Sequence, residues 1–242
     1  MNVVIELLRQ RFSYLIFGNA HGVSSNWLVK RNTKTFQNVI EVLNNPSLKF
    51  SFLERNITDG VSIFQNLLVS KSGKNYSANY DCESGMASFL YASILALRPK
   101  VVVETGIANG ISTNVIMKAL EITGGTLHSF DVDQKTANVY VGNGKWEFHL
   151  LHGNLKRTFR RKIAELGEID YWIHDSNHGF SWQSFEYAAA MKALSAGGIL
   201  VSDDIDASTA WGLMDKSSFD FSICVFDSRK FFGVAQKSIN GL

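Results

Sequence analysis

The feature that most constrains the fold is a short apolar run that ends at an acid and is followed by two glycines. Residues 101–103 are three valines, Glu104 follows them, and Gly106 and Gly110 frame a tight turn before a helical pattern begins. A strand–turn–helix of this kind opens a doubly wound α/β sheet, in which ligands bind at the carboxyl ends of the strands. The sequence therefore predicts an α/β protein with a nucleotide site directly after this strand.

The spacing of the glycines limits which nucleotide is expected. A dinucleotide fingerprint that starts at Gly106 requires glycine at positions 108 and 111, where this chain has Ala108 and Ile111. A bound pyrophosphate depends on those glycines for close approach of the backbone. The pattern therefore disfavours a nicotinamide-dependent oxidoreductase.

From residue 83 onward, apolar runs of strand length alternate with helical patterns, which predicts a mostly parallel sheet. We expect strands at 101–104, 126–131, 146–151, 169–174 and 199–202, and helices at 84–97, 110–122, 155–166 and 180–194. Gly197 and Gly198 are expected to close the last helix. Two final strands, 219–226 and 230–236, predict a C-terminal hairpin.

Residues 1–82 lack this alternation and predict a mainly helical extension, with residues 83–242 as the second domain. Helical patterns cover 35–43 and 61–69. The aromatic residues of the extension either line a pocket or pack a helical core, and we favour packing for most of them: Phe12, Tyr14, Phe17, Trp27, Tyr76 and Tyr80.

The pattern Glu104-x-Gly106-x-x-x-Gly110-x-Ser112 resembles motif I of the class I S-adenosylmethionine (SAM) methyltransferases. It is most similar to the catechol O-methyltransferase-like and macrolide-sugar O-methyltransferase branches. The resemblance implies a Rossmann-like, doubly wound, seven-stranded sheet that ends in an antiparallel hairpin, with SAM as cofactor. Glu104 and Gly106 would then belong to the cofactor site. The helix N-terminus near Gly110 and the Ser112 hydroxyl would bind the methionine carboxylate.

Two further residues extend the predicted cofactor site. Asp131 ends the second strand, 21 residues after Gly110, where an acid can accept hydrogen bonds from both ribose hydroxyls. The alternative is a helix-capping role, for which Asp133 is also placed. Asn154 follows the third strand, at the place where the resembling family binds adenine. The sequence leaves open whether Asn154 contacts that ring or caps the next helix.

Three acids follow the fourth and fifth predicted strands. Asp175 ends one strand, and Asp203 and Asp204 end the next, so their carboxylates are expected above the same crevice. A hard cation such as Mg²⁺ would relieve their repulsion. The three positions match the metal ligands of the metal-dependent branches named above. The alternatives are a capping role for Asp204, a solvated Asp203, and an Asp175 that contacts SAM or the substrate without a metal.

His178 lies three residues after Asp175, where catechol-type enzymes carry a lysine that acts as base. A histidine titrates near neutrality and can accept a hydroxyl proton, so we predict that His178 and Asp175 are catalytic. The run Asp175-x-x-His178-x-Phe180 also resembles that of a related bacterial methyltransferase group. His174 is expected to pack within its strand. The remaining histidines show no metal-ligand spacing: His21, His128, His149 and His152.

Composition excludes some partners. The net charge of +2 argues against nucleic acid and an anionic membrane, and the apolar start is interrupted by charges, so we expect no membrane span. Cys82 and Cys224 set no disulfide framework, which favours the cytoplasm. The sequence leaves homo-oligomerisation open.

These observations predict a SAM-dependent O-methyltransferase that acts on a hydroxyl of a small molecule and is assisted by Mg²⁺ or another divalent cation. The acceptor class, whether sugar, catechol or natural product, stays open. The alternatives are a metal-independent methyltransferase that uses His178 and a non-catalytic SAM-fold module with a binding or regulatory role. A metal-dependent hydrolase would leave the glycine turn unexplained.

Overall fold

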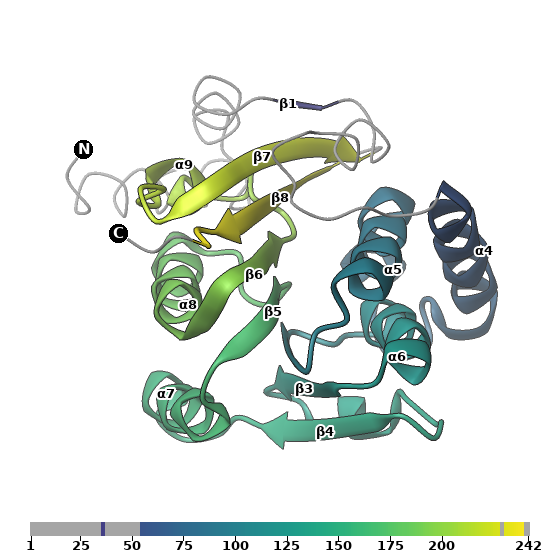
Figure 1. Ribbon diagram of the computed structural model, residues 1–242. Coiled ribbons are helices and arrows are strands. Elements are labelled where there is room, and N and C mark those ends of the chain that lie inside the picture. The colour runs from purple at the N-terminus through teal and green to yellow at the C-terminus, as the bar shows by residue number, and fades with distance from the viewer. Residues whose placement is uncertain (1–34, 37–53, 228–229, 240–242) are drawn as a thin grey trace, which may run out of the picture.

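The computed structural model describes residues 35–36, 54–227 and 230–239 of the 242-residue chain (Figure 1). Its elements, in chain order, are β1 (Thr35–Phe36), α4 (Glu54–Lys71), η1 (Ala78–Tyr80), α5 (Ser84–Leu97), β2 (Val101–Thr105), α6 (Ile111–Thr123), β3 (Thr126–Asp131), η2 (Gln134–Asn138), β4 (Lys145–Leu150), α7 (Leu155–Leu166), β5 (Ile169–His174), α8 (Phe180–Ala193), β6 (Leu194–Ser202), α9 (Ala210–Leu213), β7 (Phe219–Asp227) and β8 (Lys230–Lys237).

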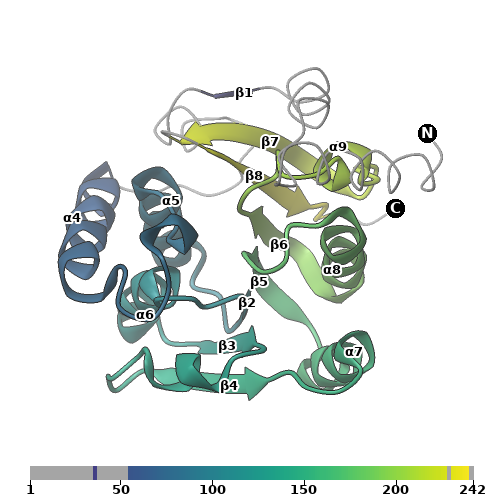
Figure 2. The same ribbon diagram turned by 180° about the vertical axis from the view of Figure 1, so that it is seen from behind.

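These elements form one sheet between two helical layers. The strand order is β1-β7-β8-β6-β5-β2-β3-β4, and β8 runs antiparallel to both β6 and β7 while the other pairs are parallel. Helices α4, α5 and α6 lie on one face, and α7 and α8 lie on the other, as Figures 1 and 2 show from opposite sides. This is the predicted doubly wound sheet with an antiparallel C-terminal hairpin.

The predicted elements after residue 83 are confirmed, most of them to within one residue. The reason is that each strand is bounded by a helix or a turn, and both faces of the central strands are buried. Val102 and Tyr171 pack in one apolar core with the helices α4 to α6, and Val103 and Trp172 pack in a second core with α7 and α8. Strands buried on both faces give the continuous apolar runs from which they were predicted.

The predicted capping role of Gly197 and Gly198 is wrong, and so is the predicted start of the following strand at residue 199. Leu194 already has an extended backbone and pairs with Ile169, so β6 begins there and contains Gly197 and Gly198. The pairing shifts register between Ile169 and Tyr171, and Gly197 within the shifted segment has a φ of 79°. A glycine pair in a strand often marks such a bulge, and here it does so in place of a helix cap.

The prediction for the extension is tested only in part. The helical pattern at 61–69 lies within α4, which packs against α5 and α6. The helix predicted at 35–43 is wrong at its start, because Thr35 and Phe36 form the short edge strand β1 beside β7. This adds an eighth strand to the expected seven. The rest of that pattern lies outside the described residues.

Buried polar residues join strands β2 and β3 to α6, the helix between them. The Glu104 carboxylate accepts hydrogen bonds from the hydroxyls of Ser112 (2.7 Å) and Thr113 (2.8 Å) on α6 and Ser129 (2.7 Å) on β3. Burial raises the pKa of Glu104 to about 7, although the three hydroxyls oppose that rise. Among the described residues the Glu104 carboxyl group has no cationic partner, and it lies buried between β2, β3 and α6.

Among the helices that the structure describes, none has the length and apolar character needed to cross a membrane.

The Glu104 carboxyl predicts a specific pH dependence of stability. The pKa is about 7 in the fold and near 4.5 in an unfolded chain, so the folded state holds the proton over that interval while the unfolded chain releases it. The free energy of unfolding should therefore fall as pH rises from 4.5 to 7, by an amount on the order of 3 kcal/mol from this group. Glu104→Gln should remove that part of the fall, measured by urea unfolding at pH 5 and pH 8.

The exposed Glu168→Gln variant is the matched control and should keep the wild-type pH dependence. A Glu104→Gln variant whose stability falls as steeply as that of the wild type between the two pH values would contradict this account.

Candidate active site

The carboxyl ends of four parallel strands meet in one row. The amide of Gly106 donates to the carbonyl of Phe130 (2.9 Å), the amide of Asp175 donates to Thr105 (2.9 Å), and the amide of Asp203 donates to His174 (2.8 Å). These bonds continue the sheet ladder one step beyond β2, β5 and β6. They place the glycine turn, Asp175 and Asp203 side by side, as the sequence predicted from adjacent strands.

The turn at Gly106 requires glycine for two reasons. Its φ is 80°, a left-handed conformation that a side chain disfavours. A Cβ atom at this position would also lie 1.9 Å from the carbonyl oxygen of Asp175. The turn after β2 and the turn after β5 are therefore in direct contact, and no other residue type fits between them.

A cavity of about 870 Å³ lies over this row of strand ends. That volume is within the usual range for small-molecule and cofactor sites. The lining residues come from the glycine turn, the end of β3, the loops after β5 and β6, the start of β8 and the segment before α5: Gly106, Ile107, Ala108, Asp131, Val132, Asp133, Asp175, Ser176, His178, Asp204, Asp206, Lys230, Tyr76, Asn79 and Tyr80.

Asp131 lines the cavity and supports the glycine turn. One carboxylate oxygen accepts from the amide of Ile107 (3.0 Å), and the other accepts from the amide of Asp133 (2.9 Å). A carboxylate has about four lone-pair sites, so these bonds leave room for further donors. The cap of η2 is Asp133, whose side chain accepts from the amide of Lys135 (2.9 Å).

Other residues predicted to bind the cofactor do not line the cavity. Glu104 is fully buried, and Ser112 gives its hydroxyl to Glu104. Gly110 begins α6 with a φ of 77° and packs against Val139. Asn154 is exposed and accepts from the amide of Arg157 (3.2 Å), which is the capping alternative. These four contacts support the turn and the helices that surround the cavity.

One side of the cavity is formed by the segment before α5, which the sequence did not assign to the site. Asn109 accepts from the amides of Asn75 (3.0 Å) and Tyr76 (2.9 Å) and donates to Asp81 (2.9 Å), so the glycine turn holds the segment before α5 in place. Tyr76 donates from its phenol to Asp133. Tyr76 and Tyr80 therefore line the cavity, although the sequence favoured core packing for most of these aromatics.

His178 lies between two of the predicted acids. Its Nδ1 is 3.2 Å from a carboxylate oxygen of Asp204, and its Nε2 is 3.6 Å from one of Asp175. Burial lowers the pKa of His178, but the attraction of Asp175 and Asp204 outweighs burial and raises it above 6.5. Burial and the charge of Asp203 raise the pKa of Asp175 to about 7. The imidazole faces the cavity beside the end of β5.

Lys230 is the residue of this cluster that the sequence analysis did not identify. Its ammonium group is 2.5 Å from Asp203 and 3.7 Å from Asp204, and Lys230 itself is buried. Burial opposes the charge on Lys230, but Asp203 and its neighbouring acids raise the pKa, so the group stays charged. It begins β8, which pairs antiparallel with β6. That pairing brings the lysine to the acids across 27 residues of sequence.

The three acids do not fit Mg²⁺ as a set in this arrangement. A magnesium site needs several oxygen atoms converging on one point at about 2.1 Å. Here the Lys230 ammonium contacts Asp203, and the His178 imidazole lies between Asp175 and Asp204. Within the described ranges, these aspartates form no group of three convergent ligand atoms. The Lys230 ammonium already compensates Asp203 and Asp204, and the His178 imidazole takes up the space between Asp175 and Asp204.

His174 makes a buried pair beneath the cavity. Its Nδ1 is 2.6 Å from Oε2 of Glu186, and the same oxygen accepts from the Thr105 hydroxyl (2.6 Å). The other oxygen, Oε1, accepts from the Ser176 hydroxyl (2.7 Å). The rings of His174 and His178 meet edge to face at 5.6 Å. His174 is fully buried, as expected for a packed strand residue, and the pair ties α8 to the ends of β2 and β5.

Comparisons with known proteins agree with this geometry. A family model described as a methyltransferase domain matches residues 103–205, which run from β2 past the acids at the end of β6. The match covers fewer than half of the 242 residues and agrees with the resemblance of the glycine turn to the class I methyltransferases. No curated protein matches the chain by sequence.

Solved structures show the same fold at low sequence identity. The SAH-bound methyltransferase PaMTH1 of Podospora anserina is 11% identical, with 78% of this chain and 91% of that one covered and a TM-score of 0.53. The SAM-bound O-methyltransferase TomG of Streptomyces achromogenes is 14% identical, with 87% and 98% covered and a TM-score of 0.50. These similarities show the fold alone.

Proposed function

We propose that this protein transfers the methyl group of SAM to a hydroxyl of a small molecule, with His178 as the general base. The carrying observation is that one cavity is lined by the glycine turn at Gly106, by Asp131 and by His178. The residues that we expect to bind the cofactor and the group that we expect to accept the proton thus line the same cavity. The similarity to TomG, an O-methyltransferase of tomaymycin synthesis, supports oxygen as the accepting atom.

The cavity fits SAM by the chemistry of its residues. Gly106 lines the cavity, and its missing Cβ leaves room for the carbonyl of Asp175. Asp131 keeps acceptor sites for ribose hydroxyls beyond the two amides that it already binds. SAM supplies an electrophilic methyl group. The residues of the chain would hold the nucleoside at the turn, beside the loops after β5 and β6.

His178 is placed to take the proton of the accepting hydroxyl. Its ring is held between Asp175 and Asp204, whose negative charges stabilise the imidazolium that forms when the proton arrives. Lys230 offers a fixed positive charge beside the same acids and lines the cavity. Alignment of the hydroxyl and removal of water from the cavity supply the rest of the acceleration.

A His178→Gln variant should lose methyl transfer by about 10²- to 10⁴-fold in kcat while the Kd for SAM stays within about twofold. The base acts in its neutral form, and the carboxylates hold its pKa above 6.5, so wild-type kcat should rise with pH with a midpoint above 6.5. The variant should lose that rise. The measurement is SAH formation from SAM with a panel of catechols, sugars and polyphenols, beside calorimetry with SAM.

An exposed histidine gives the matched control, since His152→Gln should leave both activity and SAM binding unchanged. A His178→Gln variant with wild-type kcat would contradict the base assignment. Wild-type protein that shows no heat with SAM at high protein concentration would contradict the proposal as a whole.

The sequence predicted that Mg²⁺ assists the reaction, and we treat this as the less favoured of two forms of the proposal. Lys230 already supplies a positive charge to Asp203 and Asp204, where the prediction placed a divalent cation. Replacing that ammonium by Mg²⁺ would require the lysine to leave a buried ion pair, which is costly. We therefore favour the metal-independent form of the reaction.

The metal question has a direct test. Wild-type methyl transfer should keep its rate after EDTA treatment and gel filtration, and millimolar Mg²⁺ should change the rate by less than about twofold, because the Lys230 ammonium already occupies the place beside Asp203 and Asp204. A catechol O-methyltransferase that needs Mg²⁺ serves as the positive control for the chelation. Loss of activity with EDTA that Mg²⁺ restores would favour the magnesium-assisted form.

The remaining assignments are also proposals. We propose a small-molecule acceptor over nucleic acid or a membrane, since the net charge is only +2. Cys82 and Cys224 are buried free thiols, which supports a reducing compartment such as the cytoplasm. A non-catalytic SAM-fold module is the alternative, and it predicts SAM binding with no SAH formed from any acceptor.

A further inference from the structure

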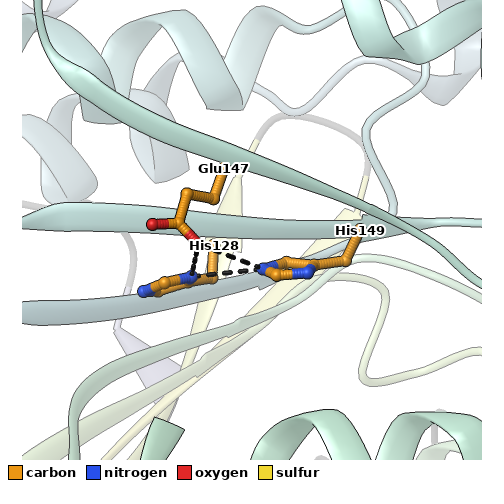
Figure 3. Close-up of side chains that lie close together, drawn as sticks. All are labelled: His128, Glu147 and His149. Atoms are coloured by element: carbon orange, nitrogen blue, oxygen red, sulfur yellow. Dashed lines mark hydrogen bonds and ion pairs between the residues drawn. The ribbon is translucent and has the colours of Figure 1, made fainter.

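Three potential metal ligands meet on the sheet away from the active-site cavity. His128 lies on β3, and Glu147 and His149 lie on the neighbouring strand β4. The parallel pairing sets His128 opposite Glu147 and Phe130 opposite His149, so the three side chains share one face of the sheet. Figure 3 shows the two imidazoles edge to edge, with the Glu147 carboxylate beside the nitrogen atoms that face each other.

The three facing atoms have the spacing of metal ligands. Nδ1 of His128 is 3.2 Å from Nε2 of His149 and 3.3 Å from Oε2 of Glu147, and that oxygen is 3.9 Å from Nε2 of His149. A tetrahedral cation with bonds of 2.0–2.1 Å separates its ligand atoms by about 3.3 Å. The cluster is therefore close to one triangular face of a tetrahedral site. Among the described residues it is the one group of three histidine, cysteine or acid side chains that converges in this way.

We propose that His128, Glu147 and His149 bind one transition-metal cation of the zinc class. Two imidazole nitrogens and one carboxylate oxygen suit Zn²⁺, Co²⁺ or Ni²⁺, whereas Mg²⁺ and Ca²⁺ prefer oxygen ligands throughout. The Glu147 side chain is 58% exposed, which leaves the fourth position open to water. This site is separate from the acids at the ends of β5 and β6 and does not rest on the proposed methyl transfer.

The surroundings position the two rings. The His149 ring stacks on Phe130 at 4.6 Å, and His128 is largely buried, with 7% of its surface exposed. Burial lowers the pKa of both imidazoles, that of His149 to about 4 with help from the charge of Lys162. A metal binds the neutral form of the imidazole.

Lys162 on α7 opposes the metal. Its ammonium group is 3.4 Å from Nδ1 of His149, on the far side of that ring from the cluster. A metal on Nε2 requires a proton on Nδ1, which then faces the lysine charge. The long lysine side chain has to turn away when the cation binds, so removing its charge should strengthen binding.

A bound cation would join the last strand of the sheet to its neighbour. β4 stands at the edge of the sheet and pairs with β3 alone in the strand order. Two of the ligands come from β4 and one from β3. The cation would thus stabilise the edge beneath Asp131, which follows His128 on the same strand by three residues.

The test is calorimetry of the full chain, stripped with EDTA and gel-filtered, with ZnCl₂ as titrant. We expect one site per chain with a Kd below about 10 μM, and a visible Co²⁺ spectrum typical of tetrahedral coordination. His149→Gln and Glu147→Gln should each weaken Zn²⁺ binding at least about tenfold. Lys162→Met should strengthen binding, and millimolar Mg²⁺ should give no heat.

The matched control is His152→Gln, an exposed histidine after β4 that should leave the Kd for Zn²⁺ unchanged. Glu147 is exposed, so its variant keeps the test valid if a histidine variant fails to fold. The proposal is overturned if the wild-type chain shows no saturable 1:1 binding. It is equally overturned if Glu147→Gln or His149→Gln binds Zn²⁺ as the wild type does, since the cation would then sit elsewhere.

Discussion

The contact between the turn at Gly106 and the backbone of Asp175 is the constraint on which the site depends. It exists because β2 and β5 are adjacent parallel strands, and because Gly106 has no Cβ to hold the two turns apart. The same contact joins the two parts of the site. In the proposed function the turn after β2 holds the cofactor, and the turn after β5 leads to His178, and both line the cavity. A larger side chain at Gly106 would push the turn after β2 away from the turn after β5, which leads to His178.

Charge balance gives the site its second constraint. Asp175, Asp203 and Asp204 lie at strand ends that the sheet forces together, and without compensation they would repel. Lys230 places a fixed positive charge beside Asp203 and Asp204, and the His178 imidazole lies against Asp204. The same acids can therefore serve a reaction that needs a histidine base and a fixed positive charge in place of a bound cation. This is why we prefer the metal-independent form of methyl transfer.

The sequence predicted the parts of the protein that depend on local order along the chain. Strands buried on both faces give continuous apolar runs, and each strand end is followed by the polar residue that faces the cavity, as at Asp131 and Asp175. It failed where two distant segments meet. Lys230 reaches the acids only because β8 pairs antiparallel with β6, and His128 reaches His149 only because of the register of β3 and β4. Neither contact can be predicted from the spacing of these residues along the chain.

The central claim is that the cavity over Gly106, Asp131 and His178 binds SAM with its methyl group toward the histidine. A crystal structure of the full chain with S-adenosylhomocysteine tests this most directly. The account predicts ribose hydroxyls within hydrogen-bond distance of Asp131 and the sulfur on the His178 side of the turn. An S-adenosylhomocysteine molecule bound outside this cavity, or with its ribose away from Asp131, would contradict it.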